Sequence, residues 1–293
     1  MGGRAFAPQH LCRPNAMSND WIDVRHSPEY QIETIQAHFE GHAYDPHWHD
    51  SYLVGVTHQG TQQFHCRRNK ITSTPGDIFL LEPGEIHDGD APTEGGFTYQ
   101  TFYLRPAWLD REIRHLFHQT PSSYALSFAK TLHSDPRLAQ SIAHTFQLLH
   151  FGELKIVQQS ALDNLLAHLA PHIHWRAELA TVQQAVSCAH QAREYMHSHV
   201  NEDLSLQDLA LLTQTDRFTL TRAFKKAFGM APHAYLVQLR LAEARIRLSQ
   251  GEKPAQVAAE LGFADQSHLG RWFRRAYRLS PAQYRQICTN LPD

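Results

Sequence analysis

Basic side chains recur at a fixed spacing near the C-terminal end of this 293-residue chain. Arg222 and Arg271 are 49 positions apart, and Lys225–Lys226 stands at the same distance from Arg274–Arg275. Arginine can bind the edge of guanine through two parallel hydrogen bonds, whereas lysine and arginine both neutralise phosphates. Two equivalent sets of such groups predict two equivalent contacts on a repeating polyanion, and double-stranded DNA is the obvious partner.

The apolar residues around these basic groups predict the elements that hold them. Phe224 and Phe273, each with a leucine four positions earlier, mark the buried stripe of a helix whose opposite face carries the basic residues. Along the chain, a shorter apolar helix comes first, then a tight turn, and then an acidic N-cap residue that begins each of these helices. This order predicts two helix-turn-helix units, at about residues 206–229 and about 254–278.

The segment between the two units, residues 232–250, predicts a connecting helix. It carries two apolar stripes on opposite sides, one through Tyr235 and Leu239 and one through Val237 and Leu241. Such a helix spans roughly 28 Å, near the ~34 Å between successive major-groove faces of DNA. We expect it to hold the two helix-turn-helix units about one DNA turn apart. The alternative is an all-helical bundle whose basic faces are merely solvated.

The expected DNA contacts lie on the outward faces of the second helix of each unit. Arg222 and Arg271 are the candidates for base contacts, and the paired basic residues that follow them are expected to meet phosphates. The full set of expected contacts is Arg217, Phe218, Thr221, Arg222, Lys225, Lys226, Gln266, Ser267, His268, Gly270, Arg271, Arg274 and Arg275.

Three histidines in the first hundred residues form a second candidate site. His47 and His49 are two positions apart, which places both rings on one face of a strand, and His87 can join them from a neighbouring strand. Such a trio suits a metal ion, the polar lining of an organic-ligand pocket, or a set of buried structural histidines. The chain has 22 histidines, so no single one decides between these interpretations.

Short alternating segments punctuated by glycine and proline run through residues 21–104 and predict an antiparallel sandwich or barrel. Residues 105–170 have helical periodicity, with apolar stripes that end near Leu149 and Leu169. These helices either pair two subunits in a homodimer or pack on their own domain.

The remaining segments are expected to be connections. Residues 171–187 are a predicted linker, and residues 1–20 are predicted to be irregular, with Met17 as an alternative start. Residues 188–288 then form the predicted DNA-binding domain.

The charge balance of the chain agrees with this division. The whole chain has 27 Lys+Arg and 29 Asp+Glu. From Val186 onward there are 14 basic and 10 acidic residues, which leaves 13 and 19 for the rest. This modest asymmetry fits a nucleic-acid-binding part joined to a part that avoids nucleic acid.

Other features exclude several classes of protein. Four cysteines without CxxC spacing argue against a disulfide framework or a zinc ribbon. The chain has no apolar run of membrane-spanning length and no apolar signal-peptide core, so a cytoplasmic location without membrane attachment is expected.

Residues 188–288 resemble the DNA-binding domain of the AraC/XylS family of bacterial transcription regulators. The segment VAAELGFADQSHLGRWFRRAYRLSPAQYR, which begins at Val257, carries most of the resemblance. One departure is Gln214, where the family's first turn often has glycine or another small residue. The motifs PHWHD, from Pro46, and PGDIFLLEPGEIHDG, from Pro75, resemble the two motifs of the cupin barrels that serve many AraC-type regulators as sensors.

The resemblance implies a multidomain α+β fold. An N-terminal cupin-like β-barrel with following helices would precede an all-α domain of two helix-turn-helix motifs joined by a long helix. Metal-dependent cupins also place a glutamate a few residues after the His-x-His motif, and Asp50 to Val54 contains none. His47, His49 and His87 are therefore expected to line a ligand pocket, and no metal or other cofactor is assigned.

The implied function is ligand-responsive, sequence-specific transcription regulation without enzymatic activity. The implied partners are promoter DNA, a small-molecule effector and RNA polymerase, with activation more common than repression. Two rivals remain: a metal-dependent cupin enzyme fused to a DNA-binding module, and a non-specific architectural DNA binder.

Overall fold

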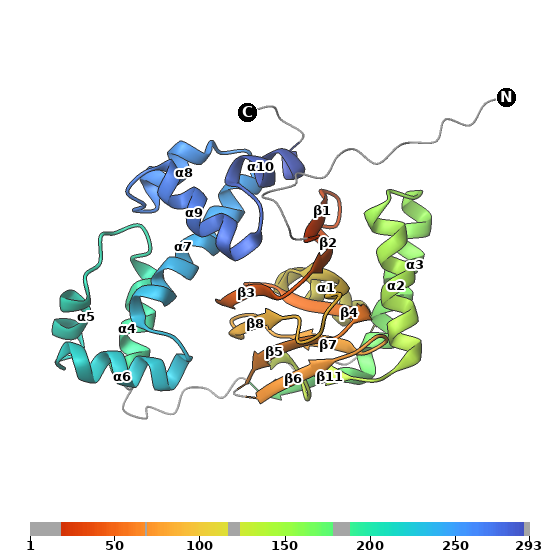
Figure 1. The fold of residues 1–293 in the computed structure, drawn as a ribbon, viewed down its shortest axis with the longest axis horizontal. Helices are drawn as coiled ribbons and strands as arrows, with labels where there is room; N and C mark the ends of the chain where they lie inside the picture. Colours follow the sequence, from red (N-terminus) through yellow and green to blue (C-terminus); the bar gives the residue numbers. More distant parts are fainter. Residues whose placement is uncertain (1–18, 68, 117–123, 178–187, 290–293) are drawn as a thin grey trace.

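A computed structural model describes residues 19–67, 69–116, 124–177 and 188–289. Figure 1 shows a β-rich domain between two helical parts, with the helix pair α2 and α3 on one side and the C-terminal helical domain on the other. None of the helices in the described ranges is long and apolar enough to cross a membrane.

Two antiparallel sheets form the β-rich domain. The larger sheet has the strand order β1-β2-β9-β4-β7-β11 and the smaller one β3-β8-β5-β6. The strands are β1 Trp21–Ser27, β2 Ile32–Phe39, β3 His42–His47, β4 Tyr52–Gly60, β5 Gln62–Cys66, β6 Asn69–Ser73, β7 Ile78–Leu81, β8 His87–Asp90, β9 Phe97–Leu104 and β11 Leu132–His133.

The larger sheet is buried on both faces. Between the two sheets lies an apolar cluster that includes Phe39, Phe64 and Phe97. The outer face of the larger sheet packs on α1 (Pro106–Leu116), α2 (Pro136–His150) and α3 (Lys155–Leu169). The apolar stripes predicted for these helices are confirmed, since their leucines, isoleucine and phenylalanine are buried in that second cluster.

The segment after the barrel contains more strand than the sequence pattern indicated. Strand β10 (Tyr124–Phe128) pairs with β12 (Ile173–Ala177), and a 3-10 helix, η1 (Ala170–His172), leads into β12. The predicted helical extension therefore includes strands, and the predicted linker begins with one. The reason is a long-range pairing that helical periodicity cannot reveal. The rest of the predicted linker lies outside the described residues.

The C-terminal domain consists of helices only. They are α4 Cys188–Ser198, α5 Leu206–Leu212, α6 Arg217–Phe228, α7 Pro232–Ser249, α8 Pro254–Glu260, α9 Gln266–Tyr277 and α10 Pro281–Thr289. Helices α5 and α6 form one helix-turn-helix unit, and α8 and α9 form the other. Asp216 and Asp265 cap the N-termini of α6 and α9 by accepting hydrogen bonds from backbone N–H groups.

The connecting helix α7 is buried on two opposite sides, as its two stripes predict. Tyr235 and Ala242 belong to the cluster around α5 and α6, whereas Leu241 and Leu248 belong to the cluster around α8 and α9. Two separate cores thus share one helix, which fixes the position of each unit relative to the other.

Arg240 on α7 ties the two units together through backbone carbonyls. Its buried guanidinium donates to the oxygens of Val200 and Glu202 beside the first unit and of Gly262 in the turn of the second, over 2.6–3.1 Å. A Cβ on Gly262 would lie 2.9 Å from this guanidinium. A larger residue there would displace the Arg240 guanidinium from its carbonyl contacts, and the φ of +67° also favours glycine.

The turn of the first unit has the same left-handed backbone without glycine. Gln214 has a φ of 51°, which costs a non-glycine residue about 1 kcal/mol. The ends of the two second helices show the reverse arrangement, with Gly229 after α6 and Arg278, at a φ of 60°, after α9. The departure noted at Gln214 is thus one of residue type and leaves the turn geometry intact.

Candidate functional site

Helices α6 and α9 present the expected DNA contacts on their outer faces. Leu220 and Phe224 of α6 and Leu269 and Phe273 of α9 are fully buried, which turns the opposite face of each helix outward. Ten of the expected contacts are exposed: Arg217, Phe218, Arg222, Lys225, Lys226, Gln266, Ser267, Arg271, Arg274 and Arg275. Thr221, His268 and Gly270 are partly buried.

Two of these positions have a more specific environment. The imidazole of His268 accepts a hydrogen bond of 2.9 Å from the indole N–H of Trp272, so that ring is held by its own helix. A Cβ on Gly270 would meet nothing within 4 Å, so the glycine leaves open space on the outer face. Gly270 can therefore contribute only by letting a partner approach the backbone closely.

One expected phosphate contact meets the β-rich domain instead. The guanidinium of Arg275 forms an ion pair with Asp45 of β3, and this pairing lowers the pKa of the Asp45 carboxyl. Arg278, directly after α9, lies over the rings of Phe39 and Tyr44. The second helix-turn-helix unit therefore docks on the barrel beside its DNA-binding face.

A buried ion pair lies at the centre of this docking contact. Arg245 of α7 donates to Glu33 of β2 at 2.5 Å, and the hydroxyl of Tyr284 of α10 also donates to Glu33. Burial acts to raise the pKa of Glu33, but the charge of Arg245 and the bond from Tyr284 outweigh it and lower the pKa. The rings of Tyr103 and Tyr277 lie 5.1 and 4.9 Å from the Arg245 guanidinium.

The sequence patterns did not indicate this ion pair. Glu33 and Arg245 are 212 positions apart. Glu33 is the one charged residue on its face of β2, whereas α7 buries a second arginine, Arg240, besides Arg245. Such a charged residue is the one local signal available, and it does not identify the partner.

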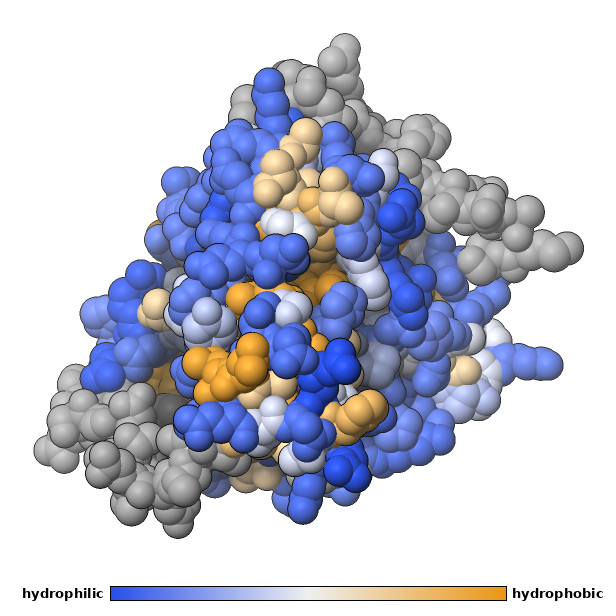
Figure 2. All heavy atoms as spheres, turned by 90° about the vertical axis from the view of Figure 1, so that its left-hand side faces the viewer, coloured by the Kyte–Doolittle hydropathy of each residue, from blue (hydrophilic) through white to orange (hydrophobic). Residues whose placement is uncertain are grey.

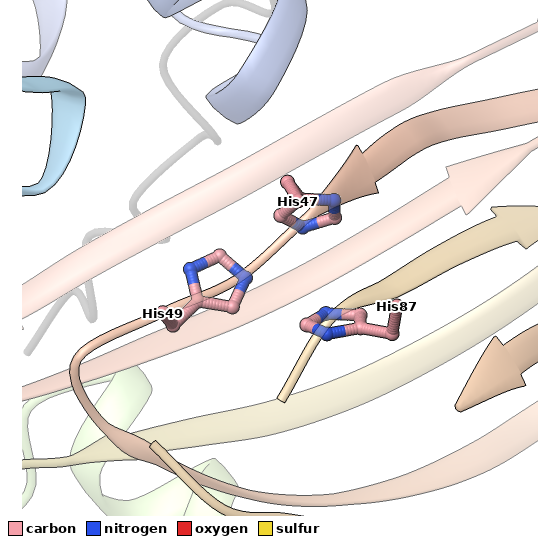
Figure 3. Close-up of side chains that lie close together, drawn as sticks. All are labelled: His47, His49 and His87. Carbon is pink, nitrogen blue, oxygen red and sulfur yellow. The ribbon is translucent and has the colours of Figure 1, made fainter. Parts of the chain in front are cut away.

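The three histidines come together at the edge of the smaller sheet (Figure 3). His47 ends β3, His49 follows in the adjoining loop, and His87 begins β8, which pairs with β3. The ring centroids are 4.4 Å apart for His47 and His87, 4.7 Å for His47 and His49, and 5.2 Å for His49 and His87. Trp48 points the other way and lies 5.9 Å from Tyr235 of α7.

These imidazoles are buried and neutral at pH 7. Burial lowers the pKa of His47 to about 3, with a further decrease from the charge of His87. Burial also lowers the pKa of His49 well below its ordinary value and lowers that of His87. The Nδ1 atoms of His47 and His87 donate to the backbone oxygens of Asp45 and Glu85, at 2.8 and 2.9 Å. Each Nε2 therefore carries a lone pair.

Two hollows adjoin this cluster. Inside the barrel, His47, His87, Tyr99 and Tyr103 line a cavity of about 30 Å³. Between the barrel and α6 lies a groove of about 800 Å³, and Lys225 is among its lining residues. Pockets for organic molecules typically have roughly 300–1,000 Å³, so the groove has the size of such a pocket and the barrel cavity does not.

Models of known protein families match both domains. A model described as an AraC-like ligand binding domain matches residues 29–170, and one described as a helix-turn-helix domain matches residues 209–287. Together they cover the barrel from β2 onward, the helices α1 to α3, and nearly all of the two helix-turn-helix units.

Relatives among known proteins are transcription regulators by name. The uncharacterized HTH-type transcriptional regulator YbfI of Bacillus subtilis is 25% identical over 255 residues, which are 86% of this chain and 91% of YbfI. The probable transcriptional regulator LumQ of Photobacterium leiognathi is 28% identical over 270 residues, 88% of this chain and 96% of LumQ. Against the regulator SACOL0084 of Staphylococcus aureus the identity is 23%, and the match spans only 31% of that longer protein.

Solved structures of the Vibrio cholerae protein ToxT share the fold. An apo form aligns with a TM-score of 0.53 and 13% identity over 94% of this chain and all of that one. ToxT bound to (E)-4-(8-methylnaphthalen-1-yl)but-3-enoic acid aligns with a TM-score of 0.54 and 12% identity over 88% and 99%. The predicted order of a β-rich domain followed by a helix-turn-helix domain is thereby confirmed.

Proposed function

We propose, from the premise that this chain belongs to the AraC/XylS family of transcription regulators, that its two helix-turn-helix units read two half-sites of one promoter sequence. The chain is a ligand-responsive DNA-binding regulator. The observation that supports two-site reading is the pair of exposed basic faces on α6 and α9, held by a single helix that is buried against both units.

Within this role, Arg222 and Arg271 are the proposed base contacts. Both are exposed and occupy equivalent positions on α6 and α9, and guanidinium groups bind guanine through two hydrogen bonds. Lys225, Lys226 and Arg274 are proposed to bind phosphates. Arg275 can join them only after giving up its ion pair with Asp45.

The test compares arginine and lysine variants on promoter DNA. Arg222→Ala and Arg271→Ala are each expected to lose about 1–3 kcal/mol of specific binding, at different half-sites. Lys225→Ala is expected to weaken binding to all sequences alike and to flatten the salt dependence. Arg111→Ala, which changes an exposed side chain of α1 in the other domain, is the matched control.

The measurement is a binding isotherm on promoter and random DNA at one salt concentration, combined with footprinting. Unchanged footprints in both arginine variants would refute the base-contact assignment. Equal affinity for promoter and random DNA would instead favour the architectural DNA binder.

We propose that the protein regulates without catalysing a reaction. Inside the barrel, the cavity of about 30 Å³ beside His47 and His87 is too small for an organic substrate, which supports this proposal. The ion pair between Glu33 and Arg245 supports coupling of the two domains, since it joins the sensor to the connecting helix.

A cytoplasmic location is part of the proposal, because the DNA partner is there.

Activation through RNA polymerase is the proposed output. Figure 2 shows apolar side chains gathered on an otherwise hydrophilic face of the helical side of the molecule. The exposed apolar residues of α5 are Leu206, Leu211 and Leu212, whereas the exposed Phe218 of α6 lies on the face that is proposed to meet DNA. DNA presents a charged backbone, so apolar residues beyond the basic face suit a protein partner better.

A homodimer formed through the α2–α3 end is also proposed. Phe151, Leu154, Ile156 and Val157 are exposed there, with Ile156 at 73% and Leu154 at 71%. A cluster of exposed apolar residues on one helix pair supports a protein–protein contact.

A further inference from the structure

We propose that His47, His49 and His87 bind one divalent first-row transition metal ion and that this ion is an effector of the regulator. The first half of the proposal concerns the site alone. The second half, the effector role, rests on the proposed function.

The three rings offer nitrogen lone pairs close to one another. The Nε2 atoms of His47 and His87 cannot be donors, because Nδ1 of each ring already donates to a carbonyl oxygen. Within the described ranges, neither Nε2 receives a hydrogen bond. His49 has the Tyr103 hydroxyl 3.3 Å from its Nε2, and its buried Nδ1 has no hydrogen-bond partner. The cluster thus offers acceptors that the protein itself does not satisfy.

The spacing suits a common ion. One nitrogen from each ring can be chosen so that all three lie within 4.8 Å of one another. With metal–nitrogen distances of about 2.0–2.1 Å, two nitrogens on one tetrahedral ion lie about 3.4 Å apart. The proposal therefore includes side-chain rotations that bring these nitrogens up to about 1.4 Å closer together. The backbone oxygens of Asp45 and Glu85 already orient two of the rings, as such hydrogen bonds do around metal-bound histidines.

The chemistry and size of the site select the class of ligand. Three neutral imidazoles without a carboxylate in the group suit zinc, cobalt, nickel, copper or ferrous ions and not calcium or magnesium. The adjoining cavity of about 30 Å³ can hold roughly two water molecules, since each needs about 10–15 Å³. An ion with one water molecule fits this cavity, whereas a sugar or an aromatic acid fits only the groove of about 800 Å³, which His87 also lines.

The site lies next to the contact that joins the two domains. The ring of His49 is 4.8 Å from that of Tyr103 and 6.1 Å from that of Tyr277, and both tyrosines flank the Arg245 guanidinium. A dication here repels Arg245, and coordination through the His49 Nε2 breaks its contact with the Tyr103 hydroxyl. Both effects weaken the ion pair with Glu33, so metal binding is expected to loosen the docking of the DNA-binding domain.

The experiment titrates the metal-free full-length chain with Zn²⁺ and Co²⁺. We expect one equivalent to bind, and we expect a Co²⁺ spectrum of nitrogen coordination without thiolate charge-transfer bands. His49→Gln and His87→Gln are each expected to lower the affinity at least tenfold, since even outer-shell changes cost that much. His65→Gln is the matched control, because His65 is exposed and pairs with Asp88.

A second readout covers variants that fold poorly. X-ray absorption of the Zn²⁺-loaded wild-type chain is expected to show three imidazole ligands. Failure to bind an ion, fewer than three imidazoles, or binding that survives both variants would overturn the site.

The effector role is measured as promoter affinity with and without Zn²⁺. We expect a change of at least about fivefold, the lower end of usual coupling between sites. An unchanged affinity with a bound ion would overturn the effector role. Loss of sequence-specific binding in both states would instead refute the proposed function and leave the metal site standing.

Discussion

Glu33→Gln is expected to destabilise the protein strongly, because it leaves the charge of Arg245 buried without a counter-charge. Both side chains are about nine-tenths buried, at 10% and 9% exposure. Removing one partner of a buried ion pair typically costs about 3–5 kcal/mol. Glutamine keeps an acceptor for the Tyr284 hydroxyl. The loss of unfolding free energy therefore reports the removal of the negative charge and not the removal of this hydrogen bond.

The assay is chemical denaturation followed by circular dichroism, with Glu29→Gln as the matched control. Glu29 pairs with Lys155 at 2.9 Å on the surface, and such exposed pairs contribute about 0–1 kcal/mol. The double variant Glu33→Met/Arg245→Met is expected to recover most of the loss, since an apolar pair leaves no buried charge. A Glu33→Gln protein within 1 kcal/mol of the control would refute this account of the domain contact.

Two further predictions concern acid stability and assembly. Burial holds the pKa of His47 near 3, so below pH 6.5 the unfolded chain binds a proton that the folded one does not. In the presence of a chelator, the free energy of unfolding is expected to fall by about 2 kcal/mol from pH 7 to pH 5 through this group, at ~1.4 kcal/mol per pH unit. Urea titrations should show a smaller fall in His47→Gln than in the wild-type chain, and the same fall as wild type in His65→Gln. Ile156→Asp is expected to shift the protein to monomers in sedimentation experiments, whereas Arg111→Asp should not, and a dimer that persists in Ile156→Asp would place the interface elsewhere.

Much of the C-terminal domain could be predicted from the sequence because its determinants are local. N-cap residues such as Asp216 and Asp265, and apolar stripes at helical spacing, act within one or two turns of the chain. The αL residue in the first turn, Gln214, was recognisable only as a departure from glycine, since its φ depends on the packing around it.

The features that could not be predicted depend on distant partners. The pairing of Tyr124–Phe128 with Ile173–Ala177 and the ion pair between Glu33 and Arg245 join segments whose local patterns carry no mark of each other. The histidine cluster could be predicted only in part. The two-residue spacing of His47 and His49 predicted a shared face, but the size of the cavity beside them depends on the aromatic side chains that fill the barrel.

The carbonyl contacts of Arg240 have a consequence for the DNA itself. Because the Arg240 side chain donates hydrogen bonds to backbone oxygens beside both helix-turn-helix units, the two units are expected to move as one rigid body. The 18 residues of α7 span about 27 Å, less than the ~34 Å repeat of the major groove. If α6 and α9 stand no farther apart than the length of α7, the duplex is expected to bend toward the protein. Base pairs between the half-sites, which no side chain touches, then contribute to target choice through their flexibility, and easily kinked pyrimidine–purine steps are favoured there.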